Sequence, residues 1–221
     1  MTQQRTRIKI CGLTRERDVD AAVAAGADAV GFVMYPKSPR FVSVARAKEL
    51  AARLPAFVTP VLLFVNASVE EVKATHGQIP ASLIQYHGDE TPAQCASAGL
   101  THIRAARIPL GPEGANFDLV KYAQDFQGAQ AILLDAHVEG YGGAGQSFQW
   151  SLLPKNVNAH LVLSGGLNAA NVTEGIAAVR PRCLSLAVDV SSGVEAAKGI
   201  KDPEKILQFV AAVRRADASF V

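Results

Sequence analysis

Short apolar runs recur along this chain, and the stretches between them have the periodicity of helices. Eight runs are rich in β-branched and other apolar residues, and they read RIKIC, AVGFVMY, PVLLFVN, SLIQYH, THIRAARI, AILLD, LVLSGG and CLSLAVDV. They follow one another at a spacing of roughly 20 to 30 residues. This alternation predicts a parallel sheet whose strands are connected by helices.

The number of units favours a closed sheet, although the periodicity alone fits an open one as well. The chain has 221 residues, of which 49% are apolar, so it can bury a substantial core. Strand-helix units use nearly all of this length and leave no segment for a second domain. We therefore expect an α/β fold, a single (β/α)8 TIM barrel, as one domain over residues 1–221 with its core at about 7–214.

Side chains that can accept hydrogen bonds from a first helical turn mark where several helices begin. The predicted capping residues are Thr14, Ser43, Ser68, Asn168 and Asp202, the last followed by Pro203. Two connections are weaker: residues 107–125 predict only a short helix, and residues 148–153 a minimal one.

Composition excludes several partners. The 22 basic and 20 acidic residues are spread evenly and give a net charge of +2, so neither nucleic acid nor a membrane surface is an expected partner. Three cysteines without Cys-x-x-Cys spacing, and histidines without ligand spacing, predict no disulfide framework and no metal. The longest apolar run, VLLFV, is too short to span a bilayer. We expect a soluble, cytoplasmic protein.

A glycine-rich stretch, GYGGAG at residues 140–145, matches the dinucleotide-binding pattern. That pattern also needs an acidic residue about 20 positions on. None occurs between Glu139 and Glu174, and Gln146 stands where a phosphate-binding loop would have lysine. We expect no nucleotide cofactor here and interpret the stretch as a flexible cover or as backbone that passes close to a ligand.

Polar residues end several of the predicted strands. In a barrel the carboxyl ends of the strands surround the active site, and the candidates there are Cys11, Asn66, His87, Asp135, Ser164 and Asp189.

Two loops after the seventh and eighth runs have the composition of a phosphate site. Their candidate residues are Ser164, Gly165, Gly166, Ser191, Ser192 and Gly193. Glycines expose backbone N–H groups to an anion, and barrels often hold phosphate at this pair of loops, closed by a short extra helix. Residues 193–197 are predicted to be that helix. Each loop alone also fits simple turn glycines.

Three further residues have both a structural and a functional interpretation. Cys11 is either a small buried apolar residue or a reactive thiol. Asp135 ends an apolar strand, where an unpartnered carboxylate is costly. Arg40 is either a solvated loop charge or a clasp for a carboxylate through two parallel hydrogen bonds.

Seven motifs together resemble the phosphoribosylanthranilate isomerase family of tryptophan biosynthesis. They are KICGLT, GADAVGFVMYPKSPRFVS, LFVN, QYHGDE, LLDAHVEGYGGAGQSFQW, LSGGLNAANV and AVDVSSGVEAAKGIKD, and the resemblance runs over about residues 7–209. The chain departs from the family at Tyr86, where Leu is usual, and at Gln146 and Gln149, where Lys and Asp are frequent.

The resemblance implies a barrel isomerase without metal or organic cofactor, acting on a small phosphorylated substrate as a monomer or homodimer. It implies Cys11 as general base, Asp135 as general acid and Arg40 as the residue that holds the anthranilate carboxylate. It also implies that the two glycine-serine loops bind the phosphate. The reaction would convert N-(5-phosphoribosyl)anthranilate to the aminodeoxyribulose phosphate by an Amadori rearrangement.

Strand alternation adds one prediction of its own. Lys9 and Cys11 share a strand face, so an inward Lys9 would lie below the thiol and lower its pKa. Closure of the barrel would pair Lys9 with Asp189, unless Lys9 points to solvent. We also place His87 and Asp189 among the substrate-binding residues, although a histidine bound to a backbone carbonyl is an equal alternative for His87.

Three other functions remain as alternatives. A histidine-pathway aminoaldose isomerase would be expected to have aspartate where this chain has Cys11. A ribulose-phosphate epimerase would need metal-binding side chains at several strand ends. A non-catalytic phosphometabolite-binding barrel would have no need for both Cys11 and Asp135.

Overall fold

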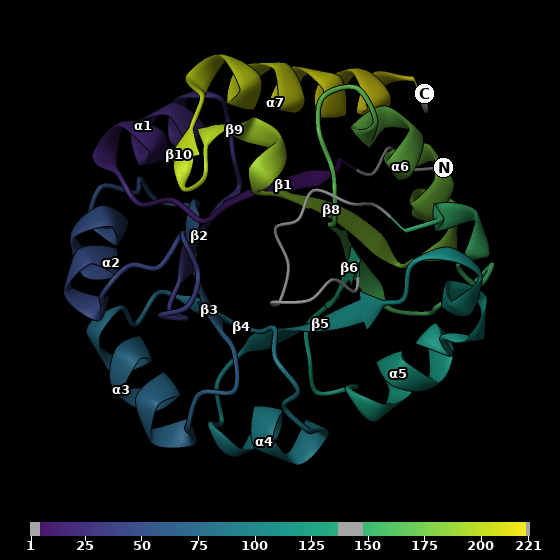
Figure 1. The fold of residues 1–221 in the computed structure, drawn as a ribbon, viewed down its shortest axis with the longest axis horizontal. Coiled ribbons are helices and arrows are strands. Elements are labelled where there is room, and N and C mark those ends of the chain that lie inside the picture. The colour runs from purple at the N-terminus through teal and green to yellow at the C-terminus, as the bar shows by residue number, and fades with distance from the viewer. Residues whose placement is uncertain (1–4, 137–147, 220–221) are drawn as a thin grey trace.

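The computed structural model describes residues 5–136 and 148–219, which form a closed parallel barrel surrounded by helices (Figure 1). The strands pair in sequence order from β1 to β8, and β8 closes on β1. Their bounds are β1 Arg7–Cys11, β2 Ala29–Val33, β3 Thr59–Phe64, β4 Leu83–Tyr86, β5 His102–Ile108, β6 Ile132–Ala136, β7 His160–Leu163 and β8 Ser185–Val190. Each lies within or beside one of the predicted runs, so the (β/α)8 barrel fold is confirmed.

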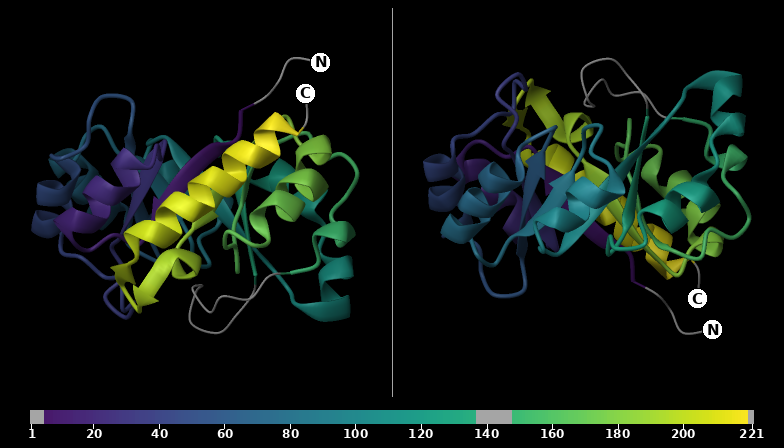
Figure 2. Two further views of the ribbon diagram at one scale, coloured as in Figure 1. Left: turned by 90° about the horizontal axis from the view of Figure 1, so that it is seen from above. Right: turned by 90° about the horizontal axis from the view of Figure 1, so that it is seen from below.

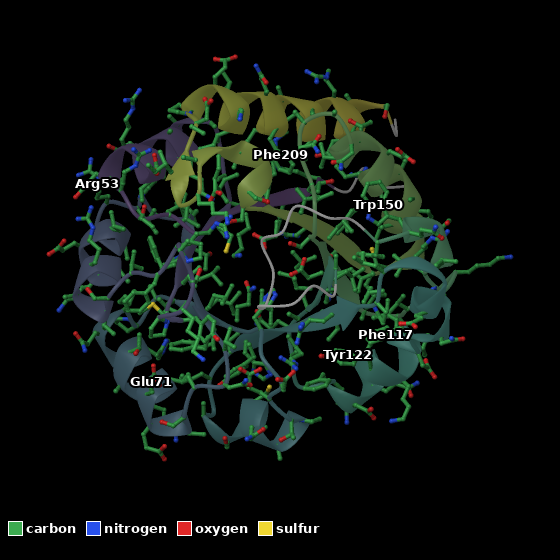
Figure 3. All side chains as sticks on the ribbon, in the orientation of Figure 1. Arg53, Glu71, Phe117, Tyr122, Trp150 and Phe209 are labelled. Atoms are coloured by element: carbon green, nitrogen blue, oxygen red, sulfur yellow. The ribbon has the colours of Figure 1, made fainter. Side chains whose placement is uncertain are left out.

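A ring of helices covers the outside of the barrel (Figure 1). Their bounds are α1 Glu16–Ala24, α2 Val44–Ala51, α3 Val69–Gln78, α4 Pro92–Ser97, α5 Leu119–Asp125, α6 Val172–Val179 and α7 Pro203–Ala218. Short 3₁₀ turns are η1 Gly111–Asn116, η2 Trp150–Leu152, η3 Arg180–Arg182 and η4 Ser192–Val194. In Figure 3 Phe209 of α7 lies on the inner side of the ring, whereas Arg53 and Glu71 lie at its outer edge. None of the described helices is long and apolar enough to cross a membrane.

Three of the predicted caps are confirmed. Ser43 accepts a hydrogen bond from the backbone of Arg46, and Ser68 accepts one from Glu71. Asp202 accepts bonds from the backbone N–H groups of two residues in the first turn of α7, which opens with proline. The expected weak connections are also as short as predicted, with η1 and α5 in the first and η2 in the second.

Two predicted caps are wrong. Helix α1 begins after Arg15, and the Thr14 hydroxyl instead donates to the carbonyl of Gly199, 2.8 Å away in a distant loop. Helix α6 begins after Asn171, and the Asn168 side chain accepts from the backbone of Ala170 within a turn that precedes the helix. In both cases the side chain expected to cap the helix forms a hydrogen bond with a residue outside that helix.

The predicted extra helix at residues 193–197 is also wrong in part. Only η4 is helical, and the chain then forms an antiparallel hairpin of β9 Glu195–Ala197 and β10 Ile200–Lys201. Gly199 turns this hairpin with a φ of +77°, a conformation that glycine adopts without strain. The hairpin lies outside the barrel, beside its rim (Figures 1 and 2).

Strand alternation separates two apolar regions. Ile8 and Ile10 of β1 belong to the large cluster between the strands and the helices. Cys11 of the same strand belongs to a small cluster with Val33 and Leu63 inside the barrel. One face of each strand therefore stabilises the fold, and the other delivers side chains to the barrel interior.

Candidate active site

The carboxyl ends of the strands bring the predicted site residues to one end of the barrel. Cys11 is the last residue of β1, and Asp135 and Asp189 are the penultimate residues of β6 and β8. His87 and Ser164 each come one residue after their strand and extend its pairing through a backbone hydrogen bond. The closed topology therefore gathers residues that are far apart in the sequence.

Lys9 and Asp189 form a buried ion pair inside the barrel. They are direct partners in the register of β1 and β8, and Lys9 Nζ donates to Asp189 Oδ1 at 2.8 Å. Both side chains are 6% exposed. The pairing predicted from alternation and closure is confirmed. Asp189 Oδ2 also accepts a longer bond of 3.4 Å from the hydroxyl of Ser164.

The Cys11 thiol lies against this pair, and the neighbouring strand leaves room for it. Gly31 is the register partner of Cys11 on β2, and a Cβ at Gly31 would come within 2.7 Å of the Cys11 sulfur. Even alanine at position 31 would therefore displace the thiol.

The predicted effect of Lys9 on the pKa of the thiol is confirmed, but it does not decide the net pKa of Cys11, which is raised. Burial raises the pKa of Cys11, the charge of Lys9 pulls it down, and the Asp189 carboxylate pushes it up again. Lys9 acts as predicted, but loss of water around the sulfur has the larger effect. Burial by itself would lower the pKa of Lys9, but the Asp189 carboxylate outweighs it and the pKa of Lys9 is raised. Lys9 is therefore a permanent cation.

A series of side-chain contacts at hydrogen-bond distance connects Gln85 and His87, at the end of β4, to Asp135 on β6. Gln85 Nε2 and His87 Nδ1 are 3.0 Å apart, and His87 Nε2 lies 3.0 Å from Asp135 Oδ2. Asp135 Oδ1 accepts a bond of 2.9 Å from the backbone of Ala136. All three side chains are buried. The His87 ring is thus bonded to two side chains and not to a backbone carbonyl, which was the alternative for this residue.

Arg40 is not a solvated loop charge. Its side chain is 10% exposed, and its Nε and Nη2 donate to the two carboxylate oxygens of Glu195 at 2.7 and 2.9 Å. The structure therefore has two parallel hydrogen bonds of the predicted kind, but to a protein carboxylate. Within residues 5–136 and 148–219, Nη1 of Arg40 has no hydrogen-bond partner, so its donors are not used by the described part of the protein.

The two glycine loops lie against each other. Gly193 is packed so tightly on the loop after β7 that a Cβ there would lie 1.9 Å from the carbonyl oxygen of Leu167. Gly165 and Gly166 have φ values of +76° and +64°, and among the described residues their backbone N–H groups donate to no other backbone group. A Cβ on Gly165 would come within 2.9 Å of Asp135 Oδ1. These loops present unpaired donors beside the carboxyl group.

Sequence reasoning missed Gln85, Glu195 and Lys201. Gln85 stands two residues before His87, the same spacing as Lys9 and Cys11, so alternation contained the signal for it. Glu195 was hidden by the helix predicted at residues 193–197, and Lys201 reaches Glu195 only through the β9–β10 hairpin, which was not predicted. Tyr86, a departure from the family pattern, packs outside the barrel with its ring 5.5 Å from that of His102, so it does not enter the site.

Other predictions fall outside the described residues. The glycine-rich stretch at residues 140–145 and Gln146 belong to the part of the chain that the structure does not describe. Among the residues that it does describe, no three His, Cys, Asp or Glu side chains are grouped as a metal site would require.

Comparisons with known proteins agree on one family. The family model for N-(5'phosphoribosyl)anthranilate (PRA) isomerase matches residues 8–212. The chain is 63% identical to the N-(5'-phosphoribosyl)anthranilate isomerase of Methylibium petroleiphilum over 214 residues, which are 97% of this chain and 96% of that protein.

Solved structures give the same result. Phosphoribosyl anthranilate isomerase from Thermotoga maritima matches with a TM-score of 0.82 and 38% identity, covering 95% of this chain and 99% of that one. A phosphoribosyl anthranilate isomerase in complex with reduced 1-(o-carboxyphenylamino)-1-deoxyribulose 5-phosphate matches with a TM-score of 0.79 and 36% identity, with the same coverage of both chains.

Proposed function

We propose, since the chain belongs to the N-(5'-phosphoribosyl)anthranilate isomerase family, that Cys11 and Asp135 carry out the two proton transfers of this isomerisation. The enzyme acts in tryptophan biosynthesis as an aldose-ketose isomerase. The observation that carries the proposal is the placement of a thiol beside a fixed cation on β1 and a carboxyl group on β6, both at the same end of one barrel.

The reaction is an Amadori rearrangement and needs one acid and one base. The acid protonates the ribose ring oxygen while the anthranilate nitrogen opens the ring to an iminium ion. The base then removes the proton from C2 to give an enolamine, which becomes the ketone 1-(2-carboxyphenylamino)-1-deoxyribulose 5-phosphate. Asp135 would supply the first proton and Cys11 would accept the second.

Lys9 supports the role of Cys11 as the base. A buried thiol has a raised pKa, and a thiolate is a stronger base when its conjugate thiol is less acidic. The permanent charge of Lys9 stabilises the thiolate when it forms, without donating its own proton. Asp189 holds Lys9 in place through the ion pair, so we assign Asp189 to the substrate site through this contact.

The two ends of the substrate would be held by separate groups. The unpaired donors of Gly165 and Gly166, with Ser164, Ser191, Ser192 and Gly193, suit the phosphate. The Nη1 donors of Arg40 suit the anthranilate carboxylate. His87 would contact the substrate next to Asp135. The reaction requires neither metal nor organic cofactor, and we propose that it takes place in the cytoplasm.

Turnover of the fluorescent aminoaldose tests the proposal directly. Adding the protein to freshly made N-(5'-phosphoribosyl)anthranilate should make the anthranilate-type fluorescence decay, and product should form in equal amount. A non-catalytic barrel would bind the compound without this decay. A histidine-pathway isomerase would turn over its own aminoaldose and leave this one unchanged. Either result would contradict the assignment.

A further inference from the structure

The guanidinium of Arg40 is held from one side only. Glu195 occupies its Nε and Nη2 edge with distances of 2.7 and 2.9 Å, and the two side chains are 10% and 6% exposed. Arginine presents a second edge, formed by Nη1 and Nη2, for another planar anion. Glu195 thus fixes the plane of the guanidinium and leaves this second edge available.

Lys201 holds Glu195 in turn. Its fully buried Nζ donates to Glu195 Oε1 at 2.8 Å, to the backbone oxygen of Ser191 at 3.0 Å and to the Ser191 hydroxyl at 3.2 Å. Burial lowers the pKa of Lys201, and the Glu195 carboxylate opposes this effect. Burial would raise the pKa of Glu195, but hydrogen bonds from Arg40 and the charge of Lys201 outweigh it and hold that pKa below its ordinary value. Three acceptors surround the Lys201 Nζ, as the three N–H bonds of an ammonium group require, so the group contains two cations and one anion.

This charge balance matters for binding an acid. If Glu195 faced Arg40 alone, the pair would be neutral and would attract a carboxylate only weakly. Lys201 restores a net charge of +1 to the cluster of Arg40, Glu195 and Lys201. Because the cluster is shielded from water, that excess charge acts at a low effective dielectric constant.

Two glycines pack closely against the segment that carries Arg40 and restrict where the cluster can lie. A Cβ on Gly12 would lie 2.5 Å from Arg40 Cδ, and a Cβ on Gly199 would lie 2.8 Å from the carbonyl oxygen of Pro39. Gly12, which follows Cys11, therefore packs closely against the Arg40 side chain. Gly199, in the turn of the β9–β10 hairpin, packs closely against the residue before Arg40. Because Lys201 also binds Ser191, the cluster connects the carboxylate clasp to the proposed phosphate loop.

We propose that Glu195 and Lys201 are positioning residues that hold Arg40 as a preorganised clasp, and that they determine the preference of the enzyme for aminoaldoses whose aryl group carries a carboxylate. The inference rests on the proposed role of Arg40. Glu195 and Lys201 act through Arg40 and need not touch the substrate. Their effect should therefore depend on the carboxylate of the substrate and not on the proton transfers.

The test compares two substrates in Glu195→Gln. One is N-(5'-phosphoribosyl)anthranilate, and the other is its aniline counterpart, which lacks the carboxylate. Glutamine keeps the size of the side chain but brings an NH₂ group against the donors of Arg40 and removes the negative charge. The net charge of the cluster would rise to +2, but the guanidinium would lose the two bonds that fix its plane. We expect this loss of positioning to dominate and KM for the carboxylated substrate to rise about tenfold or more, as for loss of a charge-assisted hydrogen bond. Its kcat should change less than about twofold, because a group that holds only the carboxylate of the substrate affects ground-state and transition-state binding alike.

Selectivity is the decisive quantity. For the aniline substrate, kcat/KM should be nearly the same in Glu195→Gln and in the wild type, so the ratio between the two substrates should fall about tenfold. A merely structural role would lower kcat/KM for both substrates equally. That result, or an unchanged ratio, would overturn the inference.

A matched control exists on the outer surface. Glu16 also binds an arginine through two hydrogen bonds, of 2.6 and 2.7 Å to Arg46, but this pair is exposed on the helix ring. Glu16→Gln should leave both substrates unaffected. Lys201→Gln, which removes the support but leaves the Arg40–Glu195 pair, should shift selectivity in the same direction as Glu195→Gln by a smaller factor. If Glu195→Gln does not fold, Lys201→Gln carries the test, and no shift in it would refute the inference.

Arg40→Ala separates this inference from the assignment beneath it. If Arg40→Ala leaves the selectivity ratio unchanged, Arg40 does not hold the carboxylate, and the proposed site is wrong at this residue. If Arg40→Ala abolishes selectivity but neither Glu195→Gln nor Lys201→Gln changes it, Arg40 is the clasp and only the positioning role fails.

Discussion

The two groups proposed to transfer protons, Cys11 and Asp135, lie in unlike surroundings at the same end of the barrel. On the thiol side, Cys11 has the ion pair of Lys9 and Asp189 beside it. On the carboxyl side, the described contacts of Asp135 are His87 and a backbone N–H group, and His87 is bonded to the uncharged Gln85. A thiol needs a nearby cation to become a base, whereas a carboxyl group next to a fixed cation would hold its charge and fail as an acid. The difference thus follows from the two roles.

The carboxyl side has a second property that the thiol side lacks. Among residues 5–136 and 148–219, the buried Gln85 Oε1 has no hydrogen-bond partner, while Gln85 Nε2 contacts His87 Nδ1. A rotated amide would present its oxygen to His87 Nδ1, which would then carry the proton. His87 Nε2 can therefore serve as a donor to a carboxylate or as an acceptor from a protonated carboxyl group. The chain accommodates Asp135 in both protonation states.

The largest effect is expected from a substitution that removes the thiol. Cys11→Ala should lower kcat by about 10²- to 10⁴-fold, the usual contribution of a general base. Product affinity should change little, because the thiol acts on a proton and adds little to ground-state binding. Single-turnover fluorescence and equilibrium binding of the reduced product analogue measure the two quantities. Retention of more than about a tenth of kcat would mean that another group is the base.

The next largest effect is expected from a substitution that removes the transferable proton of the carboxyl group. Asp135→Asn should lower kcat by about 10²-fold, at the lower end for a general acid, because asparagine keeps the contacts with His87 and Ala136. The wild type should show a bell-shaped dependence of kcat/KM on pH, set by the coupled pair. In Asp135→Asn one limb of the bell should disappear, because only one group of the pair still titrates. If the residual activity keeps both limbs, the acid is a different residue.

An intermediate effect is expected when the charge beside the thiol is removed and the thiol itself is kept. Lys9→Gln should move the acid limb of the pH profile to higher pH, because the charge of Lys9 lowers the pKa of Cys11 and its loss lets that pKa rise further. The thiolate is populated above its pKa, so activity near neutral pH should fall by about tenfold for each pH unit that the limb moves. Glutamine can still donate to Asp189. An acid limb at the wild-type position would show that Lys9 only supports the fold.

The smallest effect concerns the tautomer on the carboxyl side. Gln85→Leu should lower kcat by about two- to tenfold, which corresponds to one uncharged hydrogen bond, because His87 would lose its partner at Nδ1. Nitrogen chemical shifts of the imidazole should show a changed tautomer population, while the position of the acid limb should stay fixed. If both kcat and the tautomer population match the wild type, Gln85 only fills space.

The thiol side was more predictable from the sequence than the cluster at Arg40. Lys9, Cys11 and Asp189 depend on two regularities, strand alternation and barrel closure, and both hold along whole strands. The partner of Arg40 depends on a hairpin formed by three- and two-residue strands, where helix and strand patterns cannot be told apart. The net pKa of Cys11 depends on its burial, which the neighbouring strands decide. Local regularity can be predicted, whereas contacts between loops require the fold.

In the proposed mechanism, the depth of the Cys11 thiol determines where the hydrogen that it removes can go. The residue is only 4% exposed, so a hydrogen taken from C2 is held away from water during the lifetime of the enolamine. The same thiol can return it to C1, while the C2 hydroxyl gives its proton to the Asp135 carboxylate, and both groups then recover their starting states. Substrate carrying deuterium at C2 should accordingly yield ketone with part of the label at C1. Such a label at C1 would show that the hydrogen moves from C2 to C1 inside the barrel without exchanging with water.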